Sequence, residues 1–84
     1  MHAPDLSDNE REYMERLARE LRAAIRASLD AGLVQLAVAL DTARDTVDDA
    51  LSDAGVTASR RAIARARAEI ALEAWRGTAA APHP

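Results

Sequence analysis

Cysteine is absent from the 84-residue chain, and aromatic residues make up only 2% of it. Without cysteine, neither a disulfide framework nor a thiolate metal site is available. The hydrophobic content is 49%, but much of it is alanine, so we expect a thin core in which helices pack closely through small side chains. A chain this short buries only about 60–65% of its unfolded surface. Self-association would add the missing burial, and we expect a homodimer.

Long apolar runs and fixed catalytic groups are also missing. No apolar segment approaches the ~20 residues of a membrane span. The N-terminus has neither a basic segment nor the apolar stretch of a signal peptide, which predicts a cytoplasmic protein. The two histidines, His2 and His83, lie in the expected loose ends and cannot be held as general bases. There is no glycine-rich phosphate loop. We therefore expect no enzyme activity, no cofactor and no metal site.

The charge is unevenly distributed along the chain. The net charge is −3, which disfavours non-specific binding to nucleic acid. Residues 41–55 carry five aspartates against one arginine, a net −4, whereas residues 56–84 carry a net +3. The middle of the chain is therefore acidic, and its last helical segment is basic.

The first helical segment is predicted over residues 8–30. Ser7 and Glu10 have the spacing of a capping box, and Gly32 is the expected C-terminal stop. Apolar residues recur at helical spacing along one side of this segment: Met14, Leu17, Leu21, Ile25 and Leu29. Such a helix either lies across the other helices of a monomer or overhangs them and pairs with a symmetry mate.

The stretch from Leu33 to Val56 is predicted to form two short helices joined by a tight corner at residues 41–44. Apolar residues at helical spacing precede and follow this corner: Leu33, Leu36, Ala37 and Leu40, then Val47, Ala50, Leu51 and Ala54. Thr42 is the expected N-cap of the second short helix, and Gly55 its expected left-handed stop.

The last helix is predicted over residues 58–76, with Thr57 as its N-cap and Gly77 as its stop. Its main apolar stripe is expected to be Ile63, Ala66, Ile70 and Ala74, and Leu72 and Trp75 extend a second stripe. Trp75 is expected to anchor the core or an interface. We find no internal repeat and no strand pattern.

Three sequence features together resemble a known family. Ahead of the corner stands Ala-Gly-x-x-x-Leu-Ala, inside the second short helix Thr-Val, and behind it Leu-x-x-Ala-Gly-Val-Thr-x-x-Arg-Arg. These resemble the helix-turn-helix of resolvase and invertase C-terminal tails and of small bacterial and phage transcriptional regulators. In that family Ala37 and Val47 would pack together across the corner. The family often has glycine at the start of the corner, where this chain has Asp41.

The resemblance implies an all-α, four-helix helix-turn-helix domain over residues 7–76, with long first and last helices. A flexible N-terminus (1–6) and a disordered tail (77–84) would flank it. Its function would be that of a dimeric DNA-binding regulator. The residues nominated for double-stranded DNA are Arg44, Asp45, Thr46 and Asp49 in the recognition helix, and Arg60, Arg61 and Arg65 in the last helix.

The aspartates of the recognition helix support a different hypothesis, because carboxylates facing phosphates are repulsive. In this alternative, the acidic helix binds a basic protein partner, as an inhibitor, an antirepressor or a polymerase-binding factor does. The residues that would carry this binding are Asp45, Asp48, Asp49 and Asp53. In a third interpretation, the chain is a helical oligomerisation module that works through its long first helix.

Overall fold

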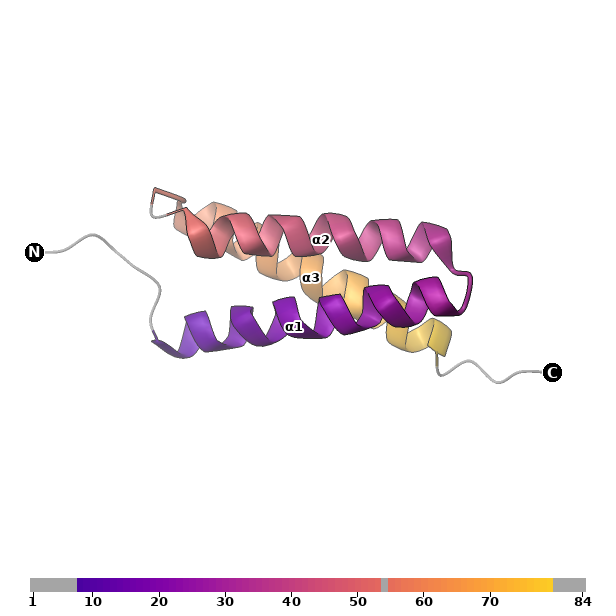
Figure 1. Ribbon diagram of the computed structural model, residues 1–84. Coiled ribbons are helices and arrows are strands. Elements are labelled where there is room, and N and C mark those ends of the chain that lie inside the picture. The colour runs from indigo at the N-terminus through magenta and orange to yellow at the C-terminus, as the bar shows by residue number, and fades with distance from the viewer. Residues whose placement is uncertain (1–7, 54, 80–84) are drawn as a thin grey trace, which may run out of the picture.

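The computed structural model describes residues 8–53 and 55–79, which form three α-helices and no strand. The helices are α1 (Asp8–Asp30), α2 (Val34–Ser52) and α3 (Ala58–Ala79). In Figure 1, α1 and α2 form an antiparallel pair, and α3 crosses behind both of them. The predicted all-α class is confirmed, but the predicted four-helix architecture is wrong.

The difference lies in α2, which runs without a break through the predicted corner at residues 41–44. Thr42 does not cap a helix there. Its hydroxyl donates instead to the carbonyl of Val38, one turn earlier, at 3.0 Å. Thr46 bonds to the carbonyl of Thr42 in the same way, at 2.9 Å. Both threonines therefore lie inside a helix and satisfy their hydroxyls by bonding back to the preceding turn.

The physical reason for the continuous helix is the absence of a helix breaker. Neither glycine nor proline occurs between Val34 and Ser52, and the aspartate at position 41 is only mildly unfavourable in a helix interior. Ala37 and Val47 are both buried. However, ten residues of continuous helix separate them by about 15 Å along the axis, so they cannot pack together across a bend. The helix-turn-helix prediction is wrong.

The turn between α1 and α2 forms as predicted at Gly32, whose φ is +78°. The amide of Gly32 donates to the carbonyl of Leu29 at 3.0 Å, and the amide of Leu33 donates to the carbonyl of Ser28 at 2.8 Å. These two bonds define a Schellman motif, in which a left-handed residue ends the helix. Glycine takes this conformation without a Cβ clash, and the chain reverses sharply into α2.

The junction between α2 and α3 depends on two side-chain caps. The carboxylate of Asp53, the extended residue that follows α2, accepts from the amide of Gly55 at 2.8 Å. Thr57 caps α3 as predicted, because its hydroxyl accepts from the amide of Arg60 at 3.2 Å. Helix α2 therefore ends at Ser52, earlier than the expected stop at Gly55. Helix α3, in contrast, continues through the expected stop at Gly77 to Ala79.

The core is built largely from alanine. Helix α1 contributes the predicted Met14, Leu17 and Leu21, and α2 contributes Leu40 and Val47. More than half of the buried apolar residues are alanines: Ala18, Ala24, Ala37, Ala43, Ala50, Ala64 and Ala68. Small side chains allow close approach of the helices, as the composition predicted. Leu29, expected in the α1 stripe, is 54% exposed instead.

Helix α3 is rotated relative to the predicted orientation. It buries Ala64, Ala68 and Leu72, and Trp75 packs against the same core. The predicted main stripe points outward: Ile63 is 50% exposed and Ile70 is 69% exposed. The second predicted stripe, Leu72 and Trp75, is the one that packs inside. The small side chains of Ala64 and Ala68 allow α3 to approach the rest of the core closely, which larger side chains at these positions would prevent.

Several predictions concern residues outside the described ranges. These are the capping role of Ser7, the flexible 1–6 segment, the places of His2, Ala54 and His83, and the tail beyond residue 79.

Candidate interaction surface

The outward side of α2, which we call the outer face, consists of Val34, Val38, Thr42, Asp45 and Asp49. These residues recur every three or four positions and therefore share one side of the helix. All except Thr42 are either aliphatic or acidic, and all are exposed. Val34 and Val38 are each 60% exposed. The outer face is thus apolar for its first two turns and acidic for the following turns.

Arg44 is the one cation on α2, and three aspartates surround it. One guanidinium nitrogen, Nη2, lies 2.9 Å from Asp41 and 3.2 Å from Asp45, and Nε lies 3.9 Å from Asp48. The hydrogen bond to Asp45 raises the pKa of Arg44, and the charges of the three aspartates act in the same direction. These three carboxylates neutralise the guanidinium, and they would compete with the guanine contact predicted for Arg44.

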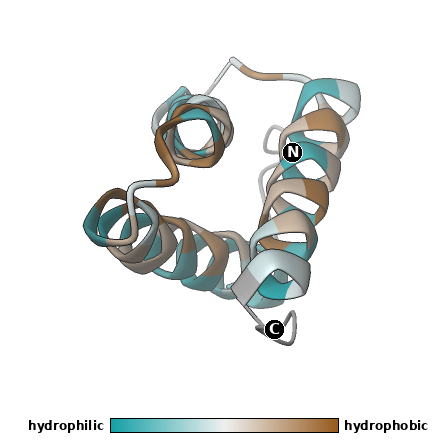
Figure 2. Cartoon of the chain, turned by 90° about the vertical axis from the view of Figure 1, so that its right-hand side faces the viewer, coloured by the Kyte–Doolittle hydropathy of each residue, from teal (hydrophilic) through white to brown (hydrophobic). Residues whose placement is uncertain are grey.

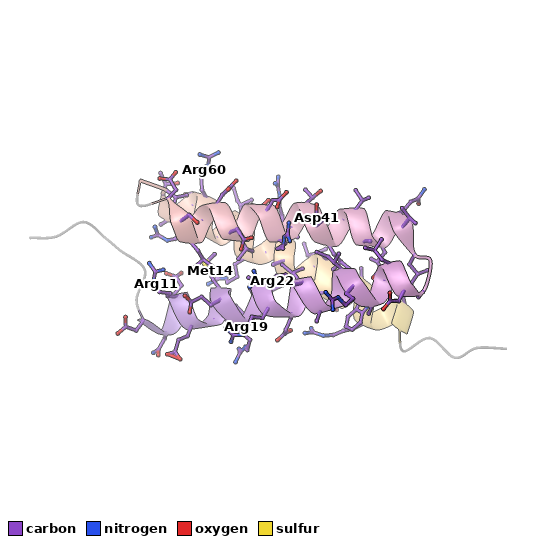
Figure 3. All side chains as sticks on the ribbon, viewed as in Figure 1. Arg11, Met14, Arg19, Arg22, Asp41 and Arg60 are labelled. Atoms are coloured by element: carbon purple, nitrogen blue, oxygen red, sulfur yellow. The ribbon has the colours of Figure 1, made fainter. Side chains whose placement is uncertain are left out.

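Of the other residues predicted to contact DNA, Thr46, Asp49 and Arg60 line one groove between α2 and α3, whereas Arg61 and Arg65 do not. Arg60 is exposed, and Figure 3 shows its side chain extending outward from the bundle. Arg61 is only 9% exposed and donates to the carbonyl of Val56 at 3.0 Å, so it braces the loop before α3. Arg65 reaches across to Glu10 of α1, 3.9 Å away. The three arginines therefore have three different environments, and Thr46 uses its hydroxyl within α2.

A groove of about 620 Å³ runs between α2 and α3 near the loop that joins them. Asp49 and Asp53 line its α2 side, and Arg60 and Arg67 line its α3 side. Its apolar lining comes from Ala50, Val56 and Ile63. We call this feature the α2–α3 groove. It gathers Thr46, Asp49 and Arg60, which were predicted to contact DNA, and the predicted protein-binding residue Asp53 around one groove.

A second apolar surface covers the tip of the α1–α2 hairpin. It joins Leu29 and Leu33, exposed by 54% and 36%, to the two valines of the outer face. Figure 2 looks onto this tip and shows hydrophobic residues along the connecting loop. The apolar part of the outer face is therefore continuous with the end of the bundle.

Within residues 8–53 and 55–79, no group of three or more histidine, cysteine, aspartate or glutamate residues could hold a metal ion. No helix of the described chain combines the length and the apolar character needed to cross a membrane.

Comparisons with protein-family models, with curated proteins and with solved structures give no significant match. The class of the protein therefore follows from its own geometry: it is an all-α, three-helix domain.

Val56, Ile63 and Arg67 line the groove, although they were not predicted from the sequence to be surface residues of a site. A signal for two of them was present. Arg60, Ile63 and Arg67 stand at spacings of three and four residues, which place them on one side of a helix. The isoleucine was assigned to the core because large aliphatic residues are usually buried, and the adjacent arginines then had no reason to be grouped with it.

Proposed function

We propose that this chain is a protein-interaction module whose outer face on α2 binds a basic and partly apolar protein surface. The observation that supports this proposal is the order of residues along that face. Two exposed valines are followed by exposed Asp45 and Asp49, and the nearby Arg44 is engaged by three carboxylates.

Duplex DNA is a poor ligand for this face. Nucleic-acid binding depends on neutralising phosphates with lysine or arginine, and residues 41–53 carry five aspartates against Arg44. The continuous α2 also lacks the bend that would present a recognition helix. If the acidic half of the outer face approached the phosphates of DNA, the aspartates would repel them and no cation on that face would compensate.

The chemistry of a suitable partner follows from the spacing of the face. Val38 and Asp45 are seven residues apart, which is about 10 Å along the helix. An amphipathic partner helix with an aliphatic patch and arginines two turns further along would match both halves. Its aliphatic side chains would cover the valines, and its guanidiniums would meet Asp45 and Asp49.

The proposal can be tested with two defined probes. One is a helical peptide with leucines and arginines at that spacing, and the other is mixed-sequence duplex DNA of similar length. Fluorescence anisotropy at several salt concentrations should show binding of the peptide, weakening as salt rises, and no comparable binding of DNA.

Paired charge reversals provide the control. Asp45→Arg with Asp49→Arg should remove peptide binding. Glu12→Arg with Glu15→Arg, on the exposed side of α1, makes the same change in net charge and should leave binding nearly intact. Equal losses in the two variants would show that only net charge matters, and preferential binding of DNA by the unaltered chain would overturn the proposal.

A further inference from the structure

The two sides of the α2–α3 groove carry opposite charges that do not neutralise each other. Asp49 on α2 and Arg60 and Arg67 on α3 all line the groove. None of the three forms an ion pair with any residue of the described chain. The groove therefore presents an acidic strip beside a basic strip, both available to an external partner.

The groove also has an apolar centre. Ile63 is 50% exposed although it is one of the larger aliphatic residues of the chain. It lies between the arginines in sequence, and the half-buried Val56 lines the groove with it. An apolar centre flanked by charged residues is the usual composition of a protein interface.

A surface with this pattern is complementary to itself. Consider a second copy related by half a turn about an axis that lies in front of the groove and parallel to it. This rotation keeps each residue at its height along the groove and exchanges the two sides, so the α2 side of one copy lies over the α3 side of the other. Asp49 lies within one turn of the end of α2, and Arg60 lies in the first turn of α3, so both stand at the same end of the groove. The rotation therefore brings them together twice, once in each direction, as a two-fold interface requires.

We infer that two copies of this chain pair through the α2–α3 groove, with Asp49 of each copy facing Arg60 of the other and the two Ile63 side chains in contact. The inference rests on the proposed function in one respect: Asp49 belongs both to the outer face and to the groove, and the basic surface that meets it is identified as the α3 helix of a second copy. The pairing would also add apolar burial to a core built largely from alanine.

Sedimentation equilibrium of the full chain tests this arrangement through charge exchange. Asp49→Arg and Arg60→Asp should each weaken the dimer by roughly tenfold or more, because each places like charges opposite one another. An equimolar mixture of the two variants should form a heterodimer, because the arginine introduced at position 49 of one chain then faces the aspartate introduced at position 60 of the other. The double variant should recover the homodimer for the same reason.

Matched controls change the same charges elsewhere. Glu15→Arg and Arg19→Asp alter the exposed side of α1, and Figure 3 shows Arg19 projecting from that helix away from α2. Neither should affect the dimer. Circular dichroism of every variant confirms that it is folded.

Two outcomes would overturn the inference. One is a wild-type chain that stays monomeric up to millimolar concentration while the basic helical peptide still binds α2, which leaves the proposed function intact. The other is a dimer that both single variants retain, or that the mixture and the double variant fail to restore. Loss of both dimer and peptide binding in the wild type would reject the two proposals together.

Discussion

Tyr13 on α1 donates a hydrogen bond to the carboxylate of Glu69 on α3, although 56 residues separate them in the chain. The guanidinium of Arg16 lies 5.2 Å from the centre of the same tyrosine ring. Close by, Arg76 pairs with Glu20 at 2.6 Å. The contacts of Tyr13 with Glu69 and of Arg76 with Glu20 therefore join α1 to α3 at the surface, beside the buried Leu17 and Leu72.

The Tyr13 contact predicts a loss of stability in alkaline solution. The hydrogen bond to Glu69 holds the phenol in its neutral form and raises the pKa of Tyr13 above its ordinary value of 10.0. Between the unfolded and the folded pKa, the unfolded chain binds fewer protons, so the free energy of unfolding falls as pH rises above about 10. Urea titrations across this range should show the decline, and Tyr13→Phe should flatten it. An equally steep decline in that variant would contradict the assignment.

Two threonines distinguish the continuous α2 from a bent one. Thr42→Ala should leave stability unchanged or raise it by about 0.5 kcal/mol, because alanine is the better residue inside a helix. Thr57→Ala should cost about 1 kcal/mol, because it removes the N-cap of α3. Urea denaturation of both variants makes the comparison. A cost at position 42 matching that at position 57 would indicate a helix start within residues 41–44.

The orientation of α3 predicts opposite results at two neighbouring aliphatic residues. Leu72→Ala should destabilise the protein by about 2–5 kcal/mol, because this side chain is buried in the core. Ile70→Ala should change stability by no more than about 0.5 kcal/mol, because Ile70 is 69% exposed. Thermal unfolding followed by circular dichroism measures both. A larger loss of stability in Ile70→Ala than in Leu72→Ala would instead support the buried stripe predicted from the sequence.

We predict that Arg61 stabilises the fold and does not bind a ligand. Its guanidinium is buried and donates to the carbonyl of Val56. Arg61→Ala should therefore cost about 1–3 kcal/mol, since the carbonyl loses a charged donor. Arg22→Ala, at an exposed position of α1, is the control and should be nearly neutral. Equal stability of the two variants would contradict the bracing role of Arg61.

The sequence predicted what local chemistry determines. Gly32 ended α1 because a left-handed residue was needed there, and Thr57 began α3 because its hydroxyl met a free amide. The stripe of Met14, Leu17 and Leu21 was also identified, because a long helix with few apolar alternatives has one buried side. Each of these features depends on residues within a few positions of one another.

The sequence did not predict features that depend on distant contacts. The polar run at residues 41–45 resembles a helix N-cap because it contains a threonine followed three residues later by an acidic residue. The same residues also fit inside a continuous helix when the apolar residues on both sides of the run belong to one core, as Leu40 and Val47 do. The orientation of α3 was misjudged for a related reason. Hydrophobicity favoured the isoleucines, whereas the space between α1 and α2 accepts alanines and Leu72. The α2–α3 groove follows from this orientation and could not be located without it.

The alanine core has a consequence for how the chain orders itself. Alanine has no side-chain rotamers, so burying Ala24 or Ala68 sacrifices no rotational freedom. At these alanines, the entropy lost on folding is that of the backbone alone. Close packing there depends on the distance between the helix axes. A single added methylene at such a position enlarges a side chain inside a packed contact, so neighbouring side chains or the helix backbones must shift to make room for it.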